Sequence, residues 1–276
     1  MLILFDNEGQ TCNKFWAYIS QIKKNLEQGI TLVIPFYDET IDDYPRFRDC
    51  SFIKFPFYSK YLNKKIGIKK YNRHLASFVH SRYYDMRGWL INTFPRIFVN
   101  AWDDHNVTYT NVEKDFIKEL FTPKLEIIES VDSFFKSLKS DARSIVGVHI
   151  RWGDYRKFDN GKYFFSLEIY KQLCESFILQ YGDAVFVICS NEAISMDYFS
   201  SLNCFSISNG SATHDLYALS QCNYIIGPPS SYSKWASFIG NVPLHFVCDF
   251  EKSKNNMSFK IVRDYDFYQD GTIIEY

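Results

Sequence analysis

Three polar side chains that could do chemistry lie close together near residue 150: His149, Arg151 and Asp154. The planar, permanently charged guanidinium group of arginine pairs with two phosphate oxygens at once. A fixed arginine would stabilise the charge that develops on a diphosphate when its bond to a sugar breaks, without a metal ion. Gly153 would let the backbone turn closely beside such a ligand. An arginine–aspartate ion pair beside a hydrogen-bonded histidine explains the same residues, so spacing alone leaves both interpretations open.

A second group of polar residues lies further along the chain. Asp215 stands near the start of an expected helix, where a carboxylate either caps free N–H groups or accepts hydrogen bonds from a base such as guanine. Ser230 and Ser231 follow an expected strand and begin a helix. A helix N-terminus attracts anions, so these hydroxyls could reach a phosphate, although both serines would also serve as helix caps.

The elements that must position these residues are short strands that alternate with helices. Apolar, β-branched runs predict strands at 144–150, 184–189, 204–207, 224–227 and 244–247, and helical periodicity predicts helices at 166–180, 192–199, 215–221 and 230–239. This alternation is typical of a parallel sheet covered on both faces. Ligands of such sheets bind beyond the carboxyl ends of the strands, where residues 149–154 are expected.

The first half of the chain shows a similar but weaker pattern. Strands are expected at 2–5, 31–36 and 96–99, and helices at 13–26, 112–120 and 124–138, whereas residues 37–75 show no regular pattern. The polar stretch 136–143 is the expected domain boundary. It gives an N-terminal α/β domain at 1–140 and a C-terminal α/β domain at 141–276. We expect the tail, 250–276, either to stay with the second domain or to pack back on the first.

Composition argues against several classes of function. The net charge is −1, and the sequence has neither the basic footprint of a nucleic-acid-binding protein nor a polybasic run for anionic lipid. No apolar run approaches the roughly 20 residues of a membrane-spanning helix, and the start does not read as a signal peptide. The seven cysteines include no CxxC pair, which predicts reduced thiols and no structural zinc site. We therefore expect a cytoplasmic protein, either free or peripheral at a membrane.

Taken together, the motifs resemble those of the α-1,2- and α-1,6-fucosyltransferase superfamily, and in particular the α-1,2 branch, glycosyltransferase family 11. The superfamily's H-x-R-R-x-D motif stands here as His149-Ile150-Arg151-Trp152-Gly153-Asp154. The later D-x-x-x-L-S-x-(C/A)-(D/N) and S-S segments stand here as Asp215 to Asn223 and Ser230-Ser231. The run SSYSKWASFIG resembles the α-1,2 branch, and GQTCNKFWAYI resembles the Gly-Asn loop after the first strand. The resemblance covers about residues 2–17 and 146–247.

This resemblance implies a GT-B fold, in which two Rossmann-like domains with parallel sheets face each other. It makes 1–140 the acceptor-side domain and 141–276 the nucleotide-sugar-binding domain. It also implies an inverting enzyme that needs neither a metal ion nor a cofactor and uses GDP-fucose as donor substrate. The expected activity is galactoside α-1,2-fucosylation in surface-glycan synthesis, with an oligosaccharide or a glycolipid-linked glycan as the acceptor.

The resemblance also implies roles for individual residues. His149 and Asp215 would hold the guanine, and Arg151 would hold the β-phosphate and assist its departure. Ser230 and Ser231 would contact the diphosphate, while Gly9 and Asn13 would form the N-terminal side of the donor site.

The transfer also needs a catalytic base. An inverting transfer passes through an oxocarbenium-like transition state, and a carboxylate can take the proton from the acceptor hydroxyl. Asp159 occupies the spacing of a base carboxylate in the α-1,6 branch, whereas Asp154 would orient Arg151.

One residue departs from the family motif. Trp152 stands where the second arginine is expected, so one cationic contact is absent or supplied from elsewhere. Arg156 and Lys157 could supply it, or they could be solvated loop charges. Two alternatives therefore remain: a GT-B enzyme that uses another nucleotide sugar, and a catalytically silent module that binds a glycan or a nucleotide. The presence of Arg151, Asp215 and the serine pair argues against the silent module.

Overall fold

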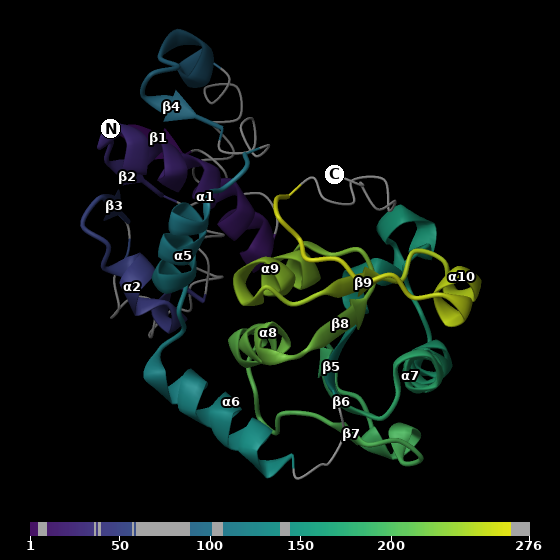
Figure 1. The fold of residues 1–276 in the computed structure, drawn as a ribbon. Coiled ribbons are helices and arrows are strands. Elements are labelled where there is room, and N and C mark those ends of the chain that lie inside the picture. The colour runs from purple at the N-terminus through teal and green to yellow at the C-terminus, as the bar shows by residue number, and fades with distance from the viewer. Residues whose placement is uncertain are drawn as a thin grey trace. The chain divides into compact units, whose positions relative to one another are not determined.

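The computed structural model describes residues 1–4, 10–35, 37, 40–56, 58, 89–100, 107–138 and 144–265. The chain divides into two compact units, Met1–Thr122 and Pro123–Tyr276, and each unit holds one parallel sheet with helices around it (Figure 1). Helix α6 (Leu125–Ser137) lies in the second unit, whereas the boundary expected from the sequence places it with the first.

The second unit is built on a five-stranded sheet with the order β7-β6-β5-β8-β9, in which every pair is parallel. The strands are β5 (Ser144–Ile150), β6 (Ala184–Ser190), β7 (Cys204–Phe205), β8 (Tyr224–Gly227) and β9 (Leu244–Phe246). From β5 the chain proceeds outward through β6 and β7, then returns to the other side of β5 through β8 and β9. The order therefore reverses between β5 and β8, the place where open α/β sheets bind their ligands.

Helices connect these strands, largely as the alternating pattern predicts. They are α7 (Leu167–Tyr181), α8 (Ala212–Gln221) and α9 (Ser231–Gly240). The helix expected at 192–199 is wrong, because only a 3-10 turn, η5 (Met196–Phe199), forms there. A helix that was not expected, α10 (Phe250–Asn255), follows β9 and is capped by the Asp249 carboxylate.

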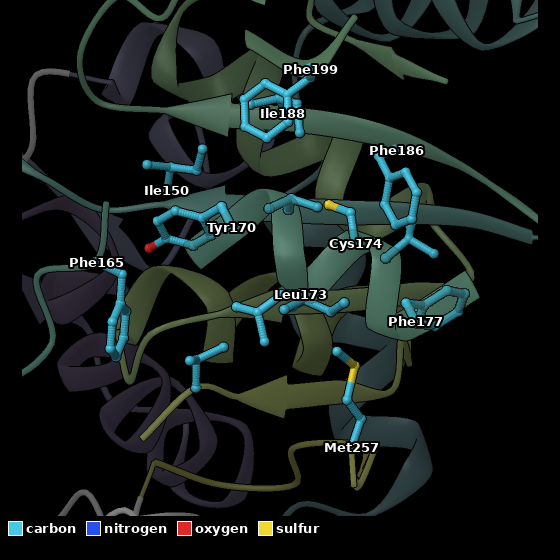
Figure 2. Packing of buried hydrophobic residues seen from close by; sticks show 14 of the residues in the cluster. Ile150, Phe165, Tyr170, Leu173, Cys174, Phe177, Phe186, Ile188, Phe199 and Met257 are labelled. Atoms are coloured by element: carbon cyan, nitrogen blue, oxygen red, sulfur yellow. The ribbon is translucent and has the colours of Figure 1, made fainter. Parts of the chain in front are cut away.

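The core of the second unit lies between α7 and the sheet. Tyr170, Leu173 and Phe177 of α7 are fully buried, and Figure 2 shows their side chains in one cluster with Phe186 of β6. Every residue of β5 from Val146 to Ile150 is buried, which is typical of a central strand covered on both faces. This burial fixes the position at which β5 ends and the loop with Arg151 begins.

The described part of the tail packs on this same unit. Lys260 forms an antiparallel bridge with Leu244 of β9, and the Val262 backbone N–H donates to Ser237 Oγ at 3.0 Å. Residues 266–276 lie outside the described residues.

The first unit holds a four-stranded parallel sheet with the order β3-β2-β1-β4. The strands are β1 (Leu2–Leu4), β2 (Leu32–Val33), β3 (Ile53–Lys54) and β4 (Phe98–Val99). The main helices are α1 (Thr11–Gln28) and α5 (Asn111–Leu120), and both were expected. The strand expected at 31–36 is shorter, with only two residues in β2.

The segment that showed no regular pattern contains short elements. These are η1 (Ile41–Asp43), α2 (Pro45–Arg48) and β3. Pro45 occupies the first turn of α2, a position that proline favours, and Phe47 of this helix stacks on Phe121 at 4.6 Å between ring centroids. Aromatic packing of this kind is tertiary, which explains why the local sequence pattern did not reveal the segment.

Two further properties concern the whole described chain. None of the described helices combines the length and the apolar character that crossing a membrane requires. All seven cysteines are free thiols, as expected; four of them are buried, and Cys50, Cys204 and Cys248 are half-buried.

Candidate functional site

The candidate site lies at the carboxyl edge of the second sheet, around the ends of β5, β6 and β8. His149 pairs with Cys189 in the register of β5 and β6, and Val148 pairs with Ile226 of β8. The loops that follow these three strands therefore begin side by side. They carry Arg151, then Asn191 and Glu192, then Ser230, while His149 lies within β5, two residues before Arg151, and Ser231 begins α9.

Arg151 is fixed from two sides directly after β5. Its Nη2 lies 2.9 Å from Asp154 Oδ1, and its Cζ lies 5.6 Å from the ring centroid of Tyr155. The Arg151 side chain is 15% exposed and that of Asp154 is 51% exposed. The guanidinium group is thus held in one orientation while part of it stays accessible to a ligand, which is the arrangement needed to bind a developing anion.

His149 is buried beside the start of α9. It is 3% exposed, its Nδ1 lies 2.7 Å from Ser233 Oγ, and its ring packs against Tyr232 with centroids 4.9 Å apart. Burial and, to a smaller extent, the nearby charge of Arg151 together lower the pKa of His149 to about 3. The imidazole is therefore neutral at physiological pH and carries no charge toward a phosphate.

Asp215 is the fourth residue of α8 and closes its first turn. The cap of this helix is Ser211, whose backbone N–H donates to His214 Nδ1 at 3.1 Å, so the capping interpretation of Asp215 is wrong. Burial raises the pKa of Asp215 to about 7, although a hydrogen bond from the Ser190 backbone opposes this shift. The carboxyl group thus lies against the last residue of β6, at the same sheet edge as His149.

Ser230 and Ser231 stand at the N-terminus of α9. Ser230 is the N-cap, and its Oγ accepts a hydrogen bond from the Tyr232 backbone at 3.1 Å. Ser231 is the first residue of the helix and is half-buried. A capping role for Ser230 is therefore present in the structure, and the partial positive charge of the helix end remains available to an anion.

The turn after Arg151 is held by two residues that the sequence analysis missed. The Trp152 backbone N–H donates to Asn191 Oδ1 at 2.8 Å, and that of Gly153 donates to Glu192 Oε1 at 2.9 Å. Gly153 has a φ of +58°, as expected of a turn glycine. Asn191 and Glu192 directly follow β6, so their place after a strand was the signal that could have revealed them.

Trp152 takes a structural role where the family motif has an arginine. Its Nε1–H donates to the Phe165 carbonyl at 2.7 Å, which ties the turn to the loop that leads into α7. Arg156 lies over the Trp152 ring at 5.8 Å and pairs with both oxygens of Glu192 at 2.5 and 2.8 Å. Because Glu192 matches its charge, Arg156 is not a free replacement for the missing cation.

Asp159 lies in a tight loop, η4 (Phe158–Gly161), beyond this turn. It has a φ of +46°, its side chain is 51% exposed, and its Oδ2 lies 3.9 Å from Lys162 Nζ. A left-handed conformation is costly for a residue with a side chain and occurs more often at functional sites than elsewhere. Asp159 is therefore accessible, and its role as base stays a hypothesis.

The residues expected from the first unit are only partly described. Asn13 is a half-buried residue in the first turn of α1, whereas Gly9 lies outside the described residues. Among the residues that the structure describes, no three His, Cys, Asp or Glu side chains are grouped so that they could hold a metal ion.

The chain is similar in sequence to one protein family and in fold to several solved structures. A model of glycosyl transferase family 11 matches residues 43–257. The fold is similar to that of the fucosyltransferase NodZ from Bradyrhizobium, with a TM-score of 0.57 and 16% identity over 94% of this chain and 98% of that one. No curated protein matches in sequence.

Two structures with bound nucleotides show the same fold. NodZ α-1,6-fucosyltransferase soaked with GDP-fucose has a TM-score of 0.55 and 16% identity over 94% of this chain and 98% of that one. POFUT1 in complex with GDP has a TM-score of 0.53 and 11% identity over 89% of this chain and 98% of that one. The fold expected from the sequence, α/β of the GT-B class with two parallel sheets, is thus confirmed.

Proposed function

The chain belongs to glycosyl transferase family 11, and from this premise we propose that it transfers fucose from GDP-fucose to a glycan hydroxyl with inversion of the anomeric centre. The observation that carries the proposal is the placement of Arg151. Its guanidinium is held at the end of β5, where the strand order of the second sheet reverses. Solved structures of the same fold bind GDP or GDP-fucose, which supports a guanosine diphosphate sugar as the donor.

The diphosphate would lie between Arg151 and the N-terminus of α9. Arg151 supplies a full positive charge, and the helix end supplies a partial one. Ser231 adds a hydroxyl at the same end. As the bond to fucose breaks, negative charge grows on the leaving diphosphate, and these fixed groups would stabilise it without a metal ion.

The guanine would bind beside Asp215 and His149. Guanine carries N–H donors on one edge, and a carboxylate accepts hydrogen bonds from them. Asp215 fits this role because it is mostly buried and the Ser190 backbone N–H already orients it. His149 would contribute a neutral ring, since its pKa lies far below physiological pH.

The acceptor is a proposal from the sequence resemblance. We propose a galactoside, fucosylated at its 2-hydroxyl, within an oligosaccharide or a glycolipid-linked surface glycan. Asp159 would take the proton from that hydroxyl, and Asp154 would keep Arg151 aligned. The seven free thiols agree with a reducing, cytoplasmic location, either free or peripheral at a membrane.

A turnover assay tests this function. The purified protein is supplied with GDP-fucose and a panel of galactosides, and the anomeric configuration of the product is read by NMR. We expect an inverted α-1,2-linked product and GDP release without an added metal ion, including in the presence of a chelator. Retention of configuration, or loss of turnover with the chelator, would contradict the mechanism.

Trp152 supports one alternative function, the use of another nucleotide sugar as donor. Because the second motif arginine is absent, the donor pocket could suit a different nucleotide sugar. A thermal-shift panel with GDP, UDP, CMP and ADP separates the cases. Stabilisation by GDP alone supports GDP-fucose, and a preference for UDP would overturn it. If no nucleotide sugar is turned over or hydrolysed, the chain is a silent binding module.

A further inference from the structure

The hydroxyl of Tyr155 connects the two turns that flank the proposed diphosphate position. Tyr155 lies in η3 (Gly153–Arg156), on the turn that follows β5, and is 9% exposed. Its OH donates to the Pro229 carbonyl at 2.5 Å, and Pro229 lies on the turn that follows β8. The contact thus spans the two neighbouring strands between which the order of the sheet reverses.

The ring of the same residue supports Arg151. The Arg151 Cζ lies 5.6 Å from the Tyr155 centroid, while Phe158 stacks on this ring with centroids 5.2 Å apart. A cation close to an aromatic ring is attracted by the ring's electrons. One side chain therefore contacts both the guanidinium on the first turn and the backbone of the second.

The second turn depends on such a contact because of its sequence. Pro228 and Pro229 have no backbone N–H, so neither can fix the turn by donating a hydrogen bond. The Pro229 carbonyl can only accept one, and Tyr155 provides the donor. Ser230, the next residue, then begins α9 as its N-cap.

The Tyr155 hydroxyl keeps its proton under all ordinary conditions. Burial raises the pKa of Tyr155 to about 12, against the opposing effects of the Arg151 charge and of a hydrogen bond with the Ser230 side chain. The hydroxyl can therefore donate to Pro229 throughout the pH range in which a protein is active.

We infer that Tyr155 is a positioning residue, which sets the separation between Arg151 and the Ser230–Ser231 end of α9 so that it matches a diphosphate. This inference rests on the proposed function. A ligand with two phosphates must engage both turns at once, so it depends on their separation. A nucleoside monophosphate lacks the second phosphate and depends on it much less.

Tyr155→Phe tests this inference, because it removes the hydroxyl and keeps the ring under Arg151. Tyr181→Phe is the matched control, since the Tyr181 OH also donates to a backbone carbonyl, that of Met257, at 2.7 Å. Tyr181 ends α7 just before β6 begins, so it lies near the opposite edge of the same sheet. Calorimetry measures GDP and GMP binding to the wild type and to both variants.

We expect Tyr155→Phe to weaken GDP binding about threefold to tenfold, the range of one neutral hydrogen bond, and GMP binding less than twofold. The KM for GDP-fucose should rise and kcat should fall, because the diphosphate is also the leaving group. Tyr181→Phe should leave the affinity for GDP and for GMP unchanged, even if it lowers the melting temperature as much as Tyr155→Phe does.

Each other outcome has a defined meaning. Equal losses for GDP and GMP, or no loss for either, would overturn the positioning role while leaving the proposed function intact. A wild-type protein that binds neither nucleotide would overturn the proposed function, and the inference with it.

Discussion

At the scale of single residues, the site combines one fixed cation with two mostly buried groups. Burial shifts the pKa of each of these two groups. Arg151 is held by Asp154 and Tyr155, whereas His149 and Asp215 lie mostly inside the protein. Burial disfavours the charged form of both, so it lowers the pKa of the histidine and raises that of the aspartate. Ligand binding and stability are therefore linked at these positions.

Replacing Arg151 should remove most of the catalytic effect. We expect Arg151→Ala to lower kcat about 100- to 1000-fold, since losing a group that stabilises developing charge has an effect of this size. Arg46→Ala serves as control, because Arg46 is an exposed arginine whose partner, Glu119, is also exposed. Steady-state kinetics with GDP-fucose measure both. Activity within tenfold of the wild type in Arg151→Ala would exclude the role proposed for it.

The pH dependence of stability should reveal Asp215. Its pKa is raised from 3.8 to about 7, so this carboxyl favours folding below about pH 4 and loses that contribution as the pH rises through 7. His149 acts oppositely, because its pKa is lowered from 6.5 to about 3: its contribution is present above pH 6.5 and is lost as the pH falls toward 3. Between about pH 4 and 6.5 the two effects oppose each other.

Asp215→Asn separates the two groups. We expect the free energy of unfolding of the variant to rise from pH 4 to 6.5, and at pH 8 to exceed that of the wild type by up to about 4 kcal/mol. GDP affinity should fall at the same time. Urea unfolding across this pH range measures the effect, with Asp183→Asn as an exposed control in the same unit. A destabilised Asp215→Asn at pH 8 would show that the carboxylate is not under strain.

At the scale of elements, the site depends on how closely α8 and α9 approach each other. Asp215 lies on α8, while Ser231 and Ser233 lie on α9. At the far end of α9, a Cβ placed on Gly240 would lie only 2.2 Å from the Ser220 carbonyl oxygen of α8. The glycine therefore permits a close contact between two helix backbones, which in turn positions the residues at their other ends.

Gly240→Ala should therefore separate the two helices. The atom that it meets belongs to the backbone, which cannot rotate away, so we expect a loss of about 2–3 kcal/mol in stability and weaker GDP binding. Gly29→Ala is the control, since it has a φ of +64° but no atom within 4 Å of the added Cβ. It should cost only the strain of that φ, about 1 kcal/mol. Thermal unfolding measures the stability of both variants, and an equal loss of stability in Gly240→Ala and Gly29→Ala would contradict the role of the helix contact.

The individual elements also show which features a local pattern can reveal. Strands β5 and β8 were expected with the bounds that the structure has, because buried strands are short apolar runs with clear ends. The segment with α2 and β3 was missed, since it is held by tertiary contacts such as the stacking of Phe47 on Phe121. The first half of the helix expected at 192–199 is loop, and Glu192 and the preceding Asn191 hold the turn after Arg151.

At the scale of the whole molecule, the chain consists of two units, and most of the proposed donor site belongs to the second. Helix α6 packs on α8 within this unit, and its Ile127 and Val131 are buried. The division after Thr122 therefore keeps α6 with the helix that carries Asp215. A domain boundary near residue 140 would separate α6 from α8, on which it packs.

Fragments of the chain test the boundary. We expect a fragment of residues 123–276 to unfold at a higher temperature than one of residues 141–276, because only the longer one retains the buried side chains of α6. Losing two buried aliphatic side chains costs about 3–6 kcal/mol. Circular dichroism on heating measures both fragments, and substituting Leu125, an exposed residue of the same helix, with Ala in the longer fragment is the control. Equal melting temperatures would favour the later boundary.

The sequence alone determined the fold class and some of the residues that form the site. Alternating apolar strands and helices require a parallel sheet, and the spacing of His149, Arg151, Asp215, Ser230 and Ser231 matches one superfamily. Only the tertiary structure decided what surrounds these residues: the neutral state of His149, the raised pKa of Asp215, and the partners of Arg156 and Tyr155. Burial and contacts between distant segments set these properties, and the local sequence does not determine either of them.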